Sequence, residues 1–132
     1  MDALTYKTKL NSLFSALRKR KIVARQMFMC CTGCGCAQLG VEHEKGQHKG
    51  KAGWAFYNKQ CAPIRRMGTS RWTRESLGAV PIGFGTFDKE ETSEGIVAVG
   101  RAILEEATRV GLKTEWDGTA DQKVTILPEE LS

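Results

Sequence analysis

Two amphipathic segments, one toward each end of the chain, constrain the fold more than any other feature of the sequence. In each segment apolar residues recur every three or four positions, which places them on one face of a helix. Such a face must be buried against another layer, so we expect the residues between the two helices to supply a sheet. The first apolar stripe comprises Leu10, Leu13, Phe14 and Leu17, and the second, in a helix over residues 92–110, comprises Ile96, Val99, Ile103, Ala107 and Val110.

Short apolar segments between and after these helices are typical of strands. A glycine-containing loop separates the last two of them, which predicts a hairpin. The element order α-β-β-β-α-β-β predicts a single α+β domain over residues 1–127, with a mostly antiparallel sheet and two helices on one face, followed by a polar tail at 128–132. The strand candidates are residues 22–29, 53–58, 79–87, 113–116 and 123–127, and long basic loops are expected at 38–51 and 59–77.

Composition narrows the class of protein further. The chain has 132 residues, of which 41% are hydrophobic, so it can bury a core and is not expected to be disordered. No apolar run reaches about 18 residues and the N-terminus lacks a signal-peptide pattern, so no membrane partner is expected. Five cysteines form an odd set without a secretory signal, which argues against a disulfide scaffold and predicts a reducing, cytoplasmic compartment.

Four of the five cysteines lie within residues 30–36, and two of them form a Cys-x-x-Cys pair. This spacing is half of a common zinc motif, and zinc takes four nitrogen or sulfur ligands. The two histidines of the chain would complete a Cys-x2-Cys-x8-His-x4-His pattern. The sequence therefore predicts a zinc cofactor, with candidate ligands Cys31, Cys34, His43, His48, Cys36 and Cys61.

The same cysteines allow two other interpretations. A thiol redox enzyme or sensor could use Cys31 and Cys34, whose thiol pKa values nearby cations would lower. The sequence shows no strand–helix–strand pattern around the motif, which weighs against this use. Alternatively, the cysteines are small buried hydrophobic residues at a strand end. In an extended strand Cys30 and Cys31 would point to opposite faces, so at most one of them would readily join a given site.

Positive charge is concentrated in the first part of the chain. Residues 1–74 carry a formal net charge of +12, whereas residues 75–132 carry −7. Arginine can form paired hydrogen bonds to phosphate and tryptophan can stack on a base, so the basic loops favour an acidic partner. The candidate anion-binding or partner-binding residues are Lys45, Lys49, Lys51, Arg65, Arg66, Arg71, Trp72 and Arg74.

The leading functional prediction is a small cytoplasmic, non-enzymatic binding protein. It would engage an acidic protein, a nucleic acid or a nucleotide through these basic loops, with zinc organising the cysteine loop. A thiol redox protein is the first alternative, and a virus- or plasmid-encoded inhibitor of a host protein is the second. No acid–base constellation stands out, and the sequence leaves a homodimer open.

Three stretches also carry a family resemblance. Residues 24–35 read Ala-Arg-Gln-Met-Phe-Met-Cys-Cys-Thr-Gly-Cys-Gly, residues 53–57 read Gly-Trp-Ala-Phe-Tyr, and residues 111–118 end in Glu-Trp-Asp-Gly, with Asp-Gln following at 121–122. Together they resemble an uncharacterised family of small bacterial domains that has an Ala-Arg-Gln-x-Phe-x-Cys-Cys-x-x-Cys-Gly signature and a C-terminal Glu-Trp-Asp-Gly hairpin. The resemblance covers residues 23–127 and implies the element order without implying an activity. Asn58 stands where that family commonly has a histidine.

Overall fold

The two amphipathic segments form helices in a computed structural model of the chain, which describes residues 2–67, 74–87 and 92–128. Helix α1 (Ala3–Lys19) begins at Asp2, whose carboxylate accepts the Thr5 N–H at 2.7 Å. Helix α3 (Ser93–Arg109) begins at Thr92, whose hydroxyl accepts a backbone N–H in the same way. Both apolar stripes face the core, which confirms these two predicted helices. No helix in the described segments is both long and apolar enough to cross a membrane.

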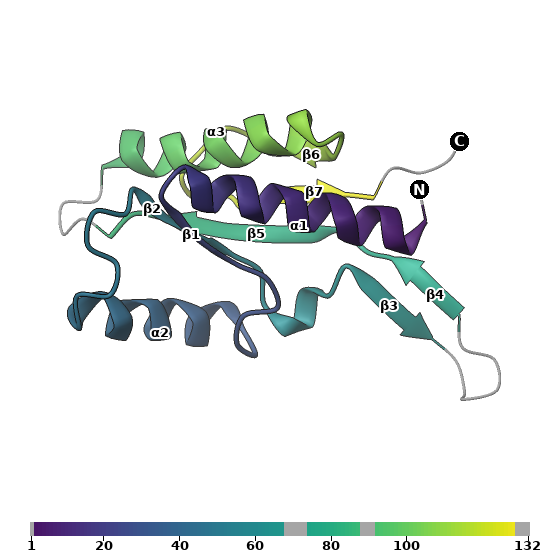
Figure 1. Cartoon of the computed structure of the whole chain (residues 1–132), viewed down its shortest axis with the longest axis horizontal. Helices are drawn as coiled ribbons and strands as arrows, with labels where there is room; N and C mark the ends of the chain where they lie inside the picture. The colour runs from purple at the N-terminus through teal and green to yellow at the C-terminus, as the bar shows by residue number, and fades with distance from the viewer. Residues whose placement is uncertain (1, 68–73, 88–91, 129–132) are drawn as a thin grey trace.

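A five-stranded sheet runs through the centre of the molecule in the order β1-β2-β5-β7-β6 (Figure 1). The β1–β2 pair is parallel, and the other neighbours are antiparallel. The predicted α+β class with a mostly antiparallel sheet is therefore confirmed. The strands are β1 (Ile22–Arg25), β2 (Gly53–Phe56), β5 (Val80–Gly85), β6 (Lys113–Glu115) and β7 (Val124–Leu127).

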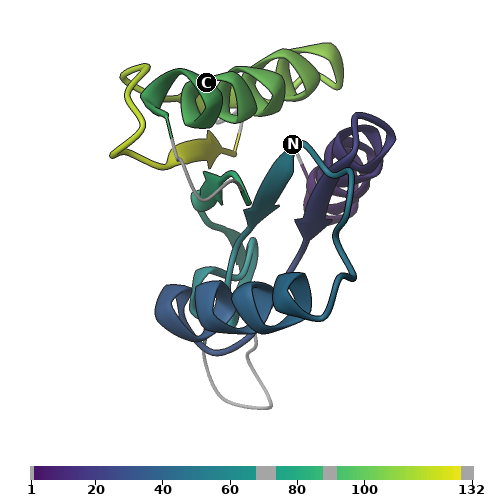
Figure 2. The same ribbon diagram turned by 90° about the vertical axis from the view of Figure 1, so that its left-hand side faces the viewer.

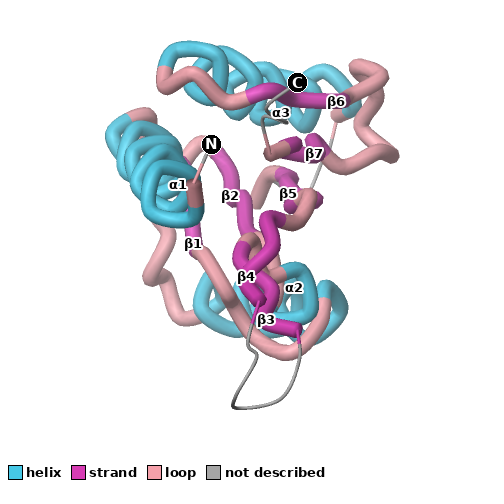
Figure 3. Tube along the Cα trace, turned by 90° about the vertical axis from the view of Figure 1, so that its right-hand side faces the viewer, coloured by secondary structure: helices cyan, strands magenta, loops and turns pink. Residues whose placement is uncertain are grey.

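Helices cover both faces of this sheet. Helices α1 and α3 pack beside each other on one face, as predicted, while a third helix, α2 (Thr32–Glu44), lies on the opposite face (Figures 2 and 3). Alternation along β2 divides its residues between the two layers: Ala55 joins the α1–α3 core, whereas Trp54 and Phe56 stack on each other at 5.4 Å on the α2 side. The largest fully buried side chains are Tyr6, Phe14, Phe56, Leu10, Leu13, Leu17, Ile82, Ile103, Ile126, Val80 and Val124.

The structure differs from the predicted element order in its middle third. The strand expected over residues 22–29 ends at Arg25, and much of the loop expected at 38–51 belongs to α2. The loop expected at 59–77 contains a short helix, η1 (Lys59–Cys61), and a separate hairpin of β3 (Ile64–Met67) and β4 (Arg74–Leu77). Residues 129–132 of the predicted tail lie outside the described part of the chain.

Close packing against the sheet explains why α2 contains glycine at its buried face. A Cβ atom on Gly35 would lie 2.5 Å from two ring atoms of Phe56, so only glycine allows the helix to approach this closely. Leu39 and Glu42 are the other buried residues of α2. The inward face of the helix therefore carries a glycine, one leucine and one acid, which is a weak apolar stripe.

Candidate functional site

The cysteine segment lies in a βαβ unit. Strand β1 leads through residues 26–31 into α2, and the chain then returns in β2, parallel to β1 with Ile22 opposite Gly53. Cys31 is the N-cap residue of α2, and Cys34 lies in the first turn of that helix. The Cys-x-x-Cys pair is thus placed at the positive end of the helix dipole.

Three sulfur atoms meet at this helix start. Cys30 Sγ lies 3.5 Å from Cys34 Sγ and 3.9 Å from Cys31 Sγ, and the three sulfurs all lie within 4.8 Å of one another. Cys30 and Cys34 are exposed and Cys31 is half-buried. We refer to Cys30, Cys31 and Cys34 as the thiol cluster. The expectation that the adjacent Cys30 and Cys31 would point apart is wrong, because the chain is no longer a strand at these residues.

The two cysteines of the pair have different acidities. The Cys34 backbone N–H, which donates to Cys31 Sγ at 3.5 Å, lowers the pKa of the Cys31 thiol below its ordinary value, and the Cys34 and Cys30 thiols add to this effect. The hydrogen bond with Cys31 is the main reason that the pKa of Cys34 rises to about 11. Cys31 is therefore the cysteine that becomes a thiolate more readily, and Cys34 is the one that holds its proton.

A left-handed turn brings the cysteines together. Met27 and Met29 adopt φ values of 52° and 61°, which are unusual for residues with side chains. Between them Phe28 packs edge-on against Phe56 at 5.4 Å, and its N–H donates to the Tyr57 carbonyl at 2.8 Å. The Met27 and Met29 side chains remain 40% and 36% exposed.

Polar contacts fix the start of α2 to the rest of the fold. The Thr32 hydroxyl accepts hydrogen bonds from Asn58 at 3.2 Å and from Lys123 at 2.8 Å. Asn58, which is 5% exposed, also caps η1. These bonds connect the thiol cluster to the residues that follow β2 and precede β7.

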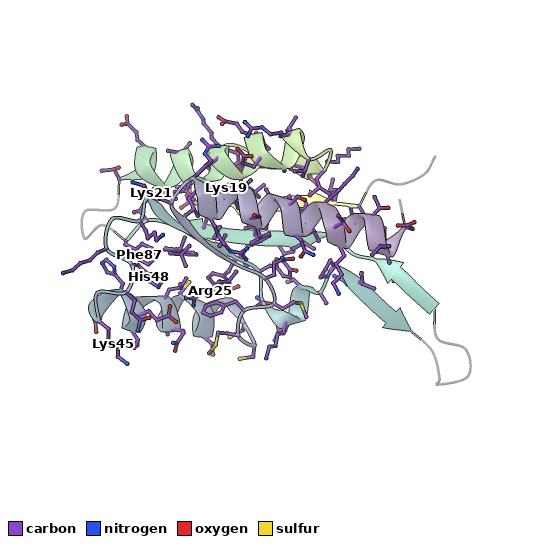
Figure 4. All side chains as sticks on the ribbon, viewed as in Figure 1. Lys19, Lys21, Arg25, Lys45, His48 and Phe87 are labelled. Atoms are coloured by element: carbon purple, nitrogen blue, oxygen red, sulfur yellow. The ribbon has the colours of Figure 1, made fainter. Side chains whose placement is uncertain are left out.

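A charged network holds the other end of α2. Arg25, from β1, makes two hydrogen bonds to the Glu42 carboxylate at 2.6 and 3.0 Å, and Gln38 donates to the same carboxylate at 2.9 Å. His48 Nε2 lies 2.8 Å from Glu42 Oε1. The hydrogen bonds from the Arg25 side chain are the main reason that the pKa of Glu42 falls to about 2. Figure 4 shows Arg25 reaching toward α2 and His48 beside Phe87.

The predicted histidine ligands belong to this second network. His43 and His48 stack on Phe87, with ring centroids 4.8 and 5.2 Å from it. At about 1.5 Å per residue, His43 lies roughly 18 Å along the helix axis from Cys31. The structure therefore does not bring either histidine to the thiol cluster. Cys36, exposed on α2, and Cys61, half-buried in η1, also lie outside the three-sulfur group.

The predicted basic residues whose side chains the structure describes do not gather on one face. Lys45, Lys49 and Lys51 are exposed around the C-terminal end of α2, where Figure 4 labels Lys45. Arg65 is exposed on β3, which follows η1 beyond the opposite end of the helix (Figure 1). Arg71 and Trp72 lie outside the described residues, as do the side chains of Arg66 and Arg74.

Fold and site together define an α+β protein with three neighbouring thiols at the start of the helix of a βαβ unit. The chain belongs to the domain of unknown function family DUF6891, whose sequence model matches residues 2–130. This agrees with the resemblance to an uncharacterised family of small domains. No curated protein and no solved structure matches the chain.

The first and last stretches behind the resemblance have structural roles. Gln26 accepts the Tyr57 hydroxyl at 2.9 Å and donates to Asn11 at 2.8 Å, so it ties the residues after β1 to α1. In the last hairpin the indole N–H of Trp116 donates to two loop carbonyls at 3.1 Å. Asp117 accepts the Thr119 N–H at 2.9 Å and closes the turn.

Proposed function

We propose that the chain binds a thiophilic metal ion through the thiol cluster, with Zn²⁺ as the first candidate. The observation that carries the proposal is the spacing of the three sulfurs. Zinc–sulfur bonds of about 2.3 Å place two sulfurs on a tetrahedral zinc about 3.8 Å apart. The Cys30 sulfur is already 3.9 and 3.5 Å from its two neighbours, so small side-chain rotations would suffice to hold the ion.

The proposed site would leave one coordination position of the ion open. In the described residues, the group that can share an ion contains three cysteines and no fourth histidine, cysteine or acid. Structural zinc sites are usually closed by four protein ligands, whereas reactive sites keep one position for water or substrate. Two of the three thiols are also exposed. We therefore propose an exchangeable ion, able to accept a ligand from a partner, in place of the closed Cys/His site predicted from the sequence.

Titration of the reduced protein with Co²⁺, followed by displacement with Zn²⁺, tests the proposal. Thiolate-to-cobalt absorption is expected to saturate at one equivalent per chain. Cys30→Ser and Cys34→Ser are each expected to weaken zinc binding at least about tenfold, since second-shell changes alone commonly do so. Cys61→Ser is the matched control and should bind as the wild type does. Substoichiometric binding, or an equal loss in the control, would contradict the proposal.

Binding of an acidic partner through the basic residues stays a prediction. Lys45 follows the C-terminal end of α2, whereas β3, which carries Arg65, lies beyond the other end of that helix, so these candidate residues do not share one surface. The thiol cluster is the more concentrated chemical feature of the molecule.

A further inference from the structure

The position of the Cys-x-x-Cys pair indicates a second chemistry that does not depend on a metal. The sequence interpretation weighed against redox activity because no strand–helix–strand pattern surrounded the motif. The structure overturns that reason, since β1, α2 and β2 form a βαβ unit and the pair opens its helix. This is the context in which a Cys-x-x-Cys motif is typical of thiol–disulfide exchange.

The two sulfurs of the pair are arranged for successive reaction. Cys31 is the helix N-cap and its Sγ accepts the Cys34 N–H at 3.5 Å, so this sulfur faces the positive end of the helix dipole. Cys34 is three residues on, and its sulfur lies within 4.8 Å of Cys31 Sγ, so a small movement of the helix start would bring the two sulfurs together.

We propose that the metal-free protein exchanges disulfides, with Cys31 as the nucleophile and Cys34 as the resolving cysteine. The substrate class is an accessible disulfide, in a polypeptide or in a small thiol compound. The residues already described supply both reacting thiols, and the substrate supplies the oxidising disulfide.

The exchange has two steps. The Cys31 thiolate attacks one substrate sulfur, a bond forms between Cys31 Sγ and that sulfur, the substrate S–S bond breaks, and the departing thiolate takes a proton from water. Cys34 then releases its proton to water and attacks Cys31 Sγ, which expels the second substrate thiolate. Two cysteine thiols are oxidised to one disulfide, and one substrate disulfide is reduced to two thiols.

The test uses the full chain, reduced and freed of metal with a chelator, mixed with either oxidised glutathione or disulfide-bonded insulin. Acid quenching, alkylation and peptide mapping identify the bonds formed. The expected product is an intramolecular Cys31–Cys34 disulfide. Cys34→Ser is expected to trap a mixed disulfide on Cys31, and Cys61→Ser should react as the wild type does. The faster of the two substrates shows which source of disulfide the protein uses.

Cys30→Ser separates this proposal from metal binding, because the two exchange steps use Cys31 and Cys34 alone whereas the proposed metal site also uses Cys30. The variant is expected to keep disulfide exchange and to lose metal affinity. Cys31 in the wild type should also be alkylated at least about tenfold faster than Cys61 at neutral pH. A product that joins Cys30 to Cys34 and leaves Cys31 reduced would overturn the proposal. So would equal alkylation of Cys31 and Cys61, or no reaction with either substrate.

Discussion

The charged network at the C-terminal end of α2 predicts a strongly pH-dependent effect of a single substitution. Glu42→Gln keeps the size of the side chain and removes its charge. The buried carboxylate accepts two hydrogen bonds from Arg25 and one from Gln38, and it contacts His48 at 2.8 Å. An amide in its place can accept at only one atom and cannot balance the guanidinium charge.

The magnitude follows from the pKa of Glu42, which falls from 4.5 to about 2 in the folded chain. A carboxyl group whose folded pKa is lowered stabilises the fold above its unfolded pKa, and this contribution is lost as the pH falls through the folded value. The shift corresponds to about 3 kcal/mol of unfolding free energy at neutral pH. The Arg25 side chain is 32% exposed, so solvent screening reduces the expected cost of Glu42→Gln to about 2 kcal/mol.

Urea unfolding of wild type and variant at several pH values measures this cost. The difference in unfolding free energy should be largest at pH 7, shrink below pH 4.5 and become small near pH 2, where about half of the folded wild-type carboxyl is protonated. Glu44→Gln, at an exposed neighbour on the same helix, is the control and should change stability by less than about 0.5 kcal/mol. A cost that is the same at pH 3 and pH 7, or no larger than that of the control, would refute the reasoning.

Three further predictions, two on packing and one on a hydrogen bond, can be measured as shifts in the thermal or urea midpoint of unfolding. Gly35→Ala should destabilise the protein by about 1–3 kcal/mol, because the new Cβ would lie 2.5 Å from ring atoms of the buried Phe56. Gly40→Ala, on the same helix but with nothing within 4 Å of the new Cβ, should instead stabilise it by up to about 1 kcal/mol; a loss of stability there would contradict the assigned packing. Trp116→Phe should cost about 1 kcal/mol or more, because it removes the N–H that bridges two loop carbonyls; an unchanged midpoint would show that the bridge contributes nothing.

The parts of the fold that could be predicted from the sequence are those built on apolar periodicity. The stripes of α1 and α3 contain several large apolar residues at helical spacing, and the last hairpin is marked by its glycine-containing loop. Local pattern and tertiary packing agree in these segments. Helix α2 escaped prediction because glycines interrupt it and its buried face consists of Gly35, Leu39 and Glu42. Gly35 makes room for the Phe56 ring, and Glu42 is bound by Arg25. Neither residue is apolar, so the sequence of α2 shows no apolar stripe.

The candidate site was predicted only in part for a related reason. The spacing of Cys31 and Cys34 identifies that pair, but a strand that continued to Met29 would point Cys30 away from Cys31. The left-handed backbone of Met27 and Met29 is incompatible with a continuing strand. Such left-handed residues without glycine have no local signal in the sequence. The histidines satisfied a ligand spacing along the chain, but the intervening helix separates them from the cysteines in space.

The distribution of packing between the two faces of the sheet suggests how this fold accommodates reactive cysteines. The α1–α3 layer buries most of the large apolar side chains, including Leu13 and Ile103. Helix α2 is held mainly by a few specific contacts, Arg25 with Glu42 at one end and Asn58 with Thr32 at the other. Since the stability of the main core does not depend on the thiol cluster, substitutions of the exposed thiols should change metal binding or exchange with little loss of global stability. The cluster is also placed where small rearrangements of one helix start would suffice to close a disulfide or to accept an ion, while the sheet that positions it stays in place.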